Sequence, residues 1–197
     1  MQVKQMAKTD KHENVSIYPF TDEEIDLLME NAGECVLMWS TKDGWPVGVT
    51  HAFIWHEGKI WVTFTAQRHR ASAIRRDNRV SVNVSSCSYP AADSNLPEGA
   101  ITFKGRGEFF EDDASKDWFY NALANKWYPD NPDFVVNLLD SPLRIMLCVT
   151  PEKKIMYNKG VADAHLAGTA EESRLGQPLE SDAERYQREL EKRGFSN

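Results

Sequence analysis

The stretch from residue 59 to residue 86 is the part of the sequence that most constrains the fold. Apolar residues occupy every second position in residues 59–65 and again in residues 79–85. This period of two predicts two β-strands with one buried face each. Between them, Ala71 and Ile74 stand three positions apart, which predicts a short helix. The stretch therefore predicts a strand, a helix and a second strand.

Other strands follow from the same pattern and from turn signals. Asp-Gly and Glu-Gly steps in the turns 42–44 and 56–58 separate alternating apolar runs, as in β-hairpins. They predict an antiparallel meander, with a final hairpin near the end of the sheet. Two interior glycines, Gly105 and Gly107, indicate a bend where a sheet curves. We therefore expect a small antiparallel barrel with peripheral helices, whose remaining strands lie in residues 34–41, 45–55, 99–110, 143–151 and 153–158.

Helix signals divide the rest of the chain. Thr21 and Glu24 form a capping box for a helix that we expect to end at Gly33. Further helices are expected after residues 111–113, after Asn131-Pro132, and after a cap at Ser181 in the charged C-terminal segment. The expected organisation is an N-terminal arm in residues 1–18, one barrel domain in residues 19–160 and a charged tail with a helix in residues 161–197.

Composition narrows the partners and the compartment. The 197 residues carry a net charge of −7, which disfavours nucleic acid and anionic membranes as partners. No apolar run reaches the roughly 18 residues of a membrane span. Three scattered cysteines predict neither a disulfide framework nor a metal site. We therefore expect a cytoplasmic protein that acts on a small molecule.

One short segment reverses the acidic balance of the chain. Five arginines and one histidine lie between residues 68 and 79. Arg68 and Arg70 stand at the start of the expected helix, where guanidinium groups and main-chain donors suit a small anion such as a phosphate. For Arg75, Arg76 and Arg79 we expect a solvated helix face.

The order of these elements resembles the flavin-binding split-barrel family that includes pyridoxamine phosphate oxidase. The resemblance runs from about Phe20 to Asn158 and rests on the pattern T-x-x-R-x-R, a helix and the phrase AIRRDNRVSVNV. It implies a mainly β fold, a six-stranded antiparallel split β-barrel, and a homodimer with the flavin at the subunit interface. The implied cofactor is FMN, with a deazaflavin as the alternative.

The resemblance also implies where the cofactor would lie. Arg70 occupies the place of a phosphate-binding lysine in the family, and Arg68 is a second phosphate ligand. We expect the hydroxyls of Thr63 and Thr65 to reach the ribityl or phosphate oxygens. The expected ring contacts are Val49, Thr50 and His51 on the neighbouring strand, with Trp127 and Tyr128 over the substrate side.

The function expected from these residues is an FMN-dependent oxidoreductase. It would transfer hydride or electrons between a reduced nicotinamide-type donor and a small organic acceptor. The alternatives are a deazaflavin-dependent reductase, whose acidic tail could meet Lys104, Arg106 and Arg79, and a flavin-binding module without catalysis. The C-terminus RELEKRGFSN lacks the Arg-Leu-x-Pro ending of a true pyridoxamine phosphate oxidase, so that activity is not expected. No residue of the sequence stands out as a catalytic acid or base.

Overall fold

The computed structural model describes residues 18–90, 95–177 and 179–195. The chain divides into two compact units: residues 22–155 form one, and residues 156–197 with residues 1–21 form the other. The arm expected in residues 1–18 lies outside the described residues except for Tyr18. The larger unit contains the predicted strand, helix and strand of residues 59–86, as β4 (Lys59–Thr65), α3 (His69–Arg76) and β5 (Arg79–Ser85).

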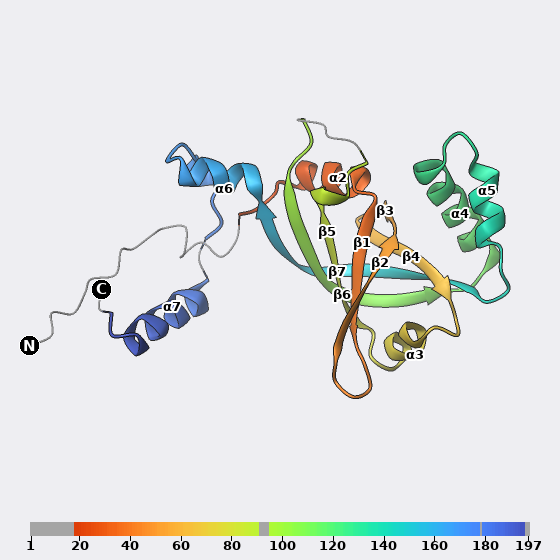
Figure 1. The fold of residues 1–197 in the computed structure, drawn as a ribbon, viewed down its shortest axis with the longest axis horizontal. Helices are drawn as coiled ribbons and strands as arrows, with labels where there is room; N and C mark the ends of the chain where they lie inside the picture. The colour runs from red at the N-terminus through yellow and green to blue at the C-terminus, as the bar shows by residue number, and fades with distance from the viewer. Residues whose placement is uncertain (1–17, 91–94, 178, 196–197) are drawn as a thin grey trace, which may run out of the picture. The chain divides into compact units, whose positions relative to one another are not determined.

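A single curled sheet forms the centre of the larger unit (Figure 1). Its strand order is β2-β1-β5-β6-β7-β4-β3. The mainly β, antiparallel split-barrel class with peripheral helices is therefore confirmed, with seven strands instead of the six expected. The remaining strands are β1 (Glu34–Ser40), β2 (Pro46–Ala52), β3 (Ile54–His56), β6 (Gly99–Phe110) and β7 (Arg144–Asn158).

The strand connections differ from the expected meander. The two hairpins read from the turn signals are present, β1 with β2 and β3 with β4. However, β1 also pairs with β5, and β4 pairs with β7, which is distant in the sequence. Turn residues specify only the pairing of neighbouring strands, so the long-range pairs that curl the sheet could not be read from them.

Two of the expected strand boundaries were wrong. The run 45–55 is interrupted at the fully buried Phe53. Before this residue the chain pairs with β1 as strand β2, and after it the chain pairs with β4 as strand β3. The expected final hairpin in residues 143–158 is one strand, β7, with Pro151 inside it. A Cβ atom on Gly105 of β6 would lie 2.3 Å from the Thr150 carbonyl oxygen. Gly105 thus lets β6 approach β7 closely where Pro151 had indicated a turn.

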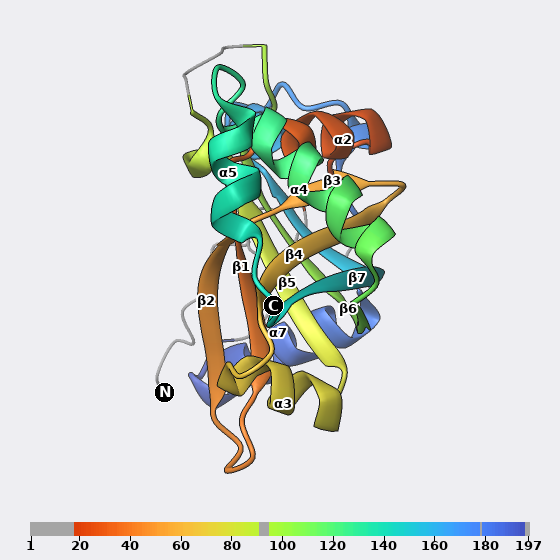
Figure 2. The same ribbon diagram turned by 90° about the vertical axis from the view of Figure 1, so that its right-hand side faces the viewer.

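The apolar core of the larger unit lies against this sheet. Leu37, Val82, Phe103 and Leu147, from four different strands, are fully buried there. The helix α2 (Asp22–Asn31) covers one end of the sheet with Ile25, Leu28 and Met29, and α3 lies at the other end (Figure 2). Burial of such side chains contributes about 1.5 to 3 kcal/mol each.

Helices α4 (Asp113–Trp127) and α5 (Pro132–Leu139) enclose a second apolar cluster beside β3. Phe119 and Leu123 of α4 pack there with Ile54 and Met146 of the sheet. The Asp112 carboxylate caps α4 by accepting from the Ser115 N–H at 2.8 Å. Asn131 holds the N-cap position of α5 as expected, but its side chain makes no cap hydrogen bond.

The smaller unit contains α6 (Lys159–Leu166), a short 3-10 turn (Glu172–Arg174) and α7 (Glu180–Lys192). Tyr18 forms an isolated parallel β-bridge with Tyr157, and the Tyr18 hydroxyl lies 3.1 Å from Nδ1 of His165. The expected cap at Ser181 was wrong, because the N-cap position is held by Leu179, two residues earlier, and α7 starts at Glu180. The helix ends at Lys192 with Arg193 as its C-cap, and Gly194 follows with a φ of 80°, as expected of a glycine that stops a helix.

Candidate functional site: an arginine pocket beside strand β4

The helix α3 begins at a pocket of about 280 Å³, which we call the arginine pocket. Strands β2 and β4 supply two walls, the turn into α3 a third, and the first residue of β7 completes the lining. Six of the eight residues expected to bind the cofactor lie together in it. Its lining is Thr50, His51, Ala52, Thr63, Phe64, Thr65, Arg68, Arg70 and Arg144.

Positive charge dominates the arginine pocket. Arg68 is the N-cap residue of α3, Arg70 lies in the first turn of this helix, and Arg144 opens β7. No aspartate or glutamate lines the pocket. The start of a helix adds a partial positive charge. In a chain with a net charge of −7, this grouping favours an anionic ligand.

Arg70 is held by packing instead of by a carboxylate. Its guanidinium carbon lies 4.9 Å from the centroid of the Phe64 ring, a cation–π contact. Its Nε atom is buried and has no hydrogen-bond partner within residues 18–90, 95–177 and 179–195. Burial, and then the charge of Arg68, lower the pKa of Arg70, which still remains charged at neutral pH. A buried charged donor without an acceptor is energetically costly. We therefore expect a ligand oxygen to accept a hydrogen bond from this N–H group.

Arg144 is the residue that sequence reasoning missed. The pairing of β4 with β7 sets it directly opposite Thr65. Its Nε donates to the Leu139 carbonyl oxygen at 3.2 Å, which fixes the side chain, and burial lowers its pKa. The sequence signal was an arginine at the start of an apolar strand. Only the register between two strands about 80 residues apart places it in the pocket.

His51 is the buried member of the pocket wall. Its ring centroid lies 5.7 Å from that of Phe64, and its Nε2 atom is buried without a hydrogen-bond partner in the described part of the chain. Burial, and then the charge of Arg70, lower the pKa of His51 from 6.5 to about 4. His51 is therefore neutral at pH 7 and offers a ring nitrogen to the pocket without a charge.

The threonines differ in the groups they leave available. The Thr63 hydroxyl donates to the Ile145 carbonyl oxygen at 2.8 Å, so its hydrogen is already used and only its oxygen can contact a ligand. Thr50 is exposed and Thr65 is half-buried. These two side chains are the neutral hydroxyl donors that the pocket can offer.

Two expected ligands do not line the arginine pocket. Val49 lies on β2 beside Thr50 and pairs with Leu37 of β1. Trp127 ends α4 and lies near Gly33, where a Cβ atom would be 3.9 Å from its ring. Tyr128, which was expected with it, is exposed and contacts the Phe134 ring instead.

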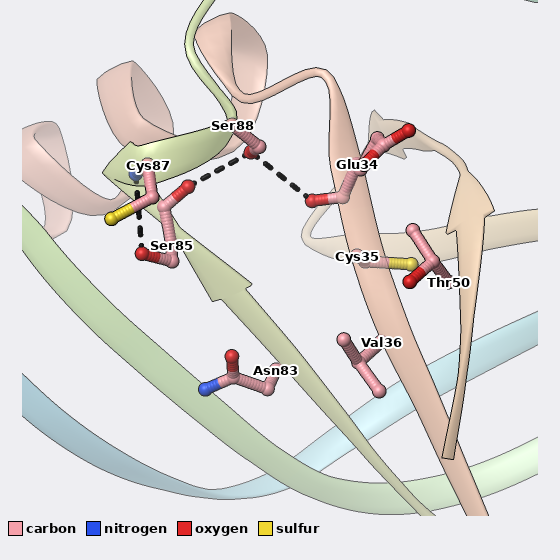
Figure 3. A pocket seen from close by; sticks show the side chains of 8 residues that line it. All are labelled: Glu34, Cys35, Val36, Thr50, Asn83, Ser85, Cys87 and Ser88. Carbon is pink, nitrogen blue, oxygen red and sulfur yellow. Dashed lines mark hydrogen bonds between the residues drawn. The ribbon is translucent and has the colours of Figure 1, made fainter.

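A second pocket of about 230 Å³ adjoins the first through Thr50, which lines both (Figure 3). We call it the second pocket. At its rim the Ser88 hydroxyl donates to the Ser85 carbonyl oxygen at 2.8 Å and lies 3.3 Å from the Glu34 carbonyl oxygen. Burial raises the pKa of the Cys35 thiol to about 12, so this thiol is not a nucleophile near neutral pH. The other members are Val36, Asn83 and the exposed Cys87.

The cations expected to meet a deazaflavin tail lie elsewhere. Arg79, Lys104 and Arg106 line a third pocket, of about 600 Å³, which shares no residue with the arginine pocket. Of the other helix arginines, Arg75 pairs with Glu111 at 2.7 Å, and Arg76 donates to the Ser40 carbonyl oxygen at 2.9 Å. Neither lines the arginine pocket.

Two other kinds of site are not found in the part of the chain that the structure describes. It contains no group of three or more histidine, cysteine, aspartate or glutamate side chains that could hold a metal ion. Among the helices described, none combines the length and the apolar character that crossing a membrane requires.

Comparisons with known proteins agree with this architecture. The family model for pyridoxamine 5'-phosphate oxidase matches residues 21–156, more than half of the chain. The chain therefore belongs to the pyridoxamine 5'-phosphate oxidase family. The comparison with proteins of curated function returned no match.

Solved structures with the same fold come from several bacteria. A conserved hypothetical protein of Mycobacterium tuberculosis superposes with a TM-score of 0.60 at 16% identity, covering 72% of this chain and 86% of its own. A candidate 5-nitroimidazole antibiotic resistance protein of Bacteroides thetaiotaomicron gives 0.56 at 15% identity, with coverages of 71% and 85%. A candidate pyridoxamine 5'-phosphate oxidase of Listeria innocua gives 0.53 at 17% identity, with coverages of 70% and 98%. At these identities the similarity concerns the fold.

Proposed function

We propose that this protein binds FMN through the arginine pocket and is an FMN-dependent oxidoreductase. The observation that carries the proposal is a pocket with three arginines and no carboxylate, in which the buried Nε of Arg70 has no hydrogen-bond partner among the residues that the structure describes. A phosphate monoester with two negative charges satisfies such a donor set. Membership in the pyridoxamine 5'-phosphate oxidase family supports FMN as the phosphate carrier.

The residues present fit this cofactor by their chemistry. The phosphate would be held by Arg68, Arg70 and Arg144. The ribityl chain would accept hydrogen bonds from the hydroxyl groups of Thr50 and Thr65. His51, neutral at pH 7, adds a ring nitrogen without competing for the anion. Bound FMN would supply the hydride and electron chemistry, which belongs to the cofactor.

The rest of the proposal concerns what enters beside the cofactor. The second pocket adjoins the arginine pocket at Thr50 and is lined by Asn83, whose amide NH2 already donates within the sheet but whose Oδ1 can accept, and by Ser85, whose hydroxyl can donate. A small organic acceptor would be oriented there by hydrogen bonds. We propose a reduced nicotinamide-type donor and a homodimer in which a second copy completes the cofactor site. The proposed reaction requires no proton transfer from a protein side chain.

Titration of the purified apoprotein with FMN and with a deazaflavin cofactor tests the proposal. We expect FMN to bind and its fluorescence to change on binding, because its phosphate meets three guanidinium groups. Binding of the deazaflavin alone would contradict the choice of FMN. The control is the Arg75→Ala variant, which removes an arginine of α3 outside the pocket and should titrate as the native protein does.

Turnover is a separate question from binding. With FMN bound, we expect oxidation of a reduced nicotinamide donor, in the presence of a quinone or nitro acceptor, faster than with the same concentration of free FMN. Tight FMN binding without faster donor oxidation would identify a flavin-binding module instead of an enzyme.

A further inference from the structure

The largest of the three pockets described above has an unusual charge content. We call it the basic groove. It has a volume of about 600 Å³, within the range of small-molecule sites, and is more than twice the size of the arginine pocket. Strands β1, β2, β5, β6 and β7 all contribute to it. Its charged lining residues are Asp77, Arg79, Lys104, Arg106, Glu152 and Lys153.

Both carboxylates of the basic groove are already engaged by arginines. Asp77 accepts from Nε and Nη2 of Arg79, and the pKa of Asp77 falls to about 2 mainly because of these bonds. Glu152 accepts from Nε of Arg106 at 2.9 Å. Two positive charges therefore remain without a counterion.

These remaining charges belong to Lys104 and Lys153. Both side chains are exposed, and neither forms an ion pair or a hydrogen bond with any residue that the structure describes. Lys104 stands on β6 and Lys153 on β7, which are neighbouring strands of the sheet. An anion entering the groove would meet both ammonium groups without first breaking an ion pair.

Strand register adds an independent observation. Arg79 of β5 lies directly opposite Arg106 of β6, and the next pair on the same face is Ser81 with Lys104. Like charges directly opposite each other in a sheet are destabilising. The sheet thus places Lys104 beside two arginines on one face, and because Arg79 and Arg106 already pair with Asp77 and Glu152, Lys104 is the cation of this group that remains available to an anionic ligand.

Strand β2 contributes residues to both the basic groove and the arginine pocket. Pro46 of β2 lines the basic groove, and Thr50 of the same strand lines the arginine pocket. Four residues along a strand span roughly 13 Å. An extended dinucleotide with its pyrophosphate in the basic groove can reach toward the arginine pocket over this separation.

We propose that the basic groove binds the phosphate groups of a nucleotide. If the proposed function holds, on which this second step rests, the nucleotide is the adenosine diphosphate end of the nicotinamide donor. Lys104 and Lys153 provide the charge for the pyrophosphate, and the Ser40 and Ser81 hydroxyls provide neutral donors. The reactive end of the donor then lies toward Thr50.

Isothermal titration with ADP and with inorganic pyrophosphate tests this assignment directly. We expect both to bind the native protein, and the double variant Lys104→Gln/Lys153→Gln to bind ADP about tenfold more weakly. The matched control is Lys59→Gln/Lys116→Gln, which removes the same charge from residues outside the groove lining. ADP affinity equal in the two double variants, or no ADP binding by the native protein, would overturn the proposal.

Further arms separate the groove from the cofactor site and from other anions. Arg70→Ala should leave ADP binding unchanged, and loss of ADP binding in that variant would place ADP in the arginine pocket and refute the groove. Binding of triglutamate in place of ADP would assign the groove to a carboxylate chain, against our proposal. FMN affinity should be the same in both lysine double variants. If ADP binds as expected but FMN does not bind at all, the nucleotide site stands and the proposed function fails.

Discussion

Replacing Arg70 by alanine is expected to weaken FMN binding by about 1.5 to 3 kcal/mol, which corresponds to a loss of roughly 10- to 150-fold in affinity. Arg70 is the arginine whose Nε is buried without an acceptor, and its guanidinium is fixed over the Phe64 ring. In the bound state this donor would contact the phosphate, and alanine would remove both the hydrogen bond and the charge. Fluorescence titration of apoprotein measures the change.

The control for this experiment lies on the same helix. Arg76 ends α3 and donates to the Ser40 carbonyl oxygen, outside the arginine pocket. The Arg76→Ala variant changes the net charge equally but should lower FMN affinity only slightly. Equal losses in the two variants would mean that the helix attracts FMN by charge alone, and the arginine pocket would not be the phosphate site.

A second large effect is expected in the pH dependence of stability. His51 has a pKa of about 4 in the folded protein and 6.5 as its ordinary value. Between these values the unfolded chain binds one proton more than the folded chain at this position. The contribution of His51 to stability is therefore complete above pH 6.5, falls as the pH drops toward 4, and then stays constant. The total loss is about 3 kcal/mol, at 1.36 kcal/mol for each unit of pKa.

The His51→Gln variant isolates this effect, because glutamine keeps a polar side chain that does not titrate in this range. Urea unfolding at a series of pH values should give a free energy of unfolding that falls more steeply below pH 6.5 for the native protein than for the variant. Parallel curves would show that His51 is not held neutral in the fold. The absolute stability of the variant at pH 7 does not enter this comparison.

The local parts of the fold could be predicted from the sequence. Alternating apolar residues gave β4 and β5, the Asp-Gly and Glu-Gly steps gave two hairpins, and a capping box gave α2. Pairing between distant strands could not be predicted, because a period of two indicates only which face of a strand is buried. Pro151 predicted a turn, but it lies within β7, beside the close approach of β6 at Gly105.

The candidate site shows the same division between local and distant information. The sequence pattern placed both Arg68 and Arg70 at the start of α3. Arg68 is the N-cap residue of this helix, and Arg70 lies in its first turn. The alternation of β4 predicted that Thr63 and Thr65 share one face of this strand, and both line the arginine pocket. Arg144 could not be found, because it reaches the pocket only through the register of β4 with β7. Trp127 was expected over the ring because the sequence placed it in a loop before a helix, whereas it is the last residue of α4 and lies near Gly33.

The most direct test of the account compares the affinities of the native protein for FMN and for riboflavin, which lacks only the phosphate. If Arg68, Arg70 and Arg144 bind that phosphate, the native protein binds FMN much more tightly than riboflavin. The Arg70→Ala variant should then lose affinity for FMN while its affinity for riboflavin stays the same, so that the ratio of the two affinities falls. Equal affinities of the native protein for the two flavins, or an unchanged ratio in Arg70→Ala, would contradict the assignment of the arginine pocket to the cofactor phosphate.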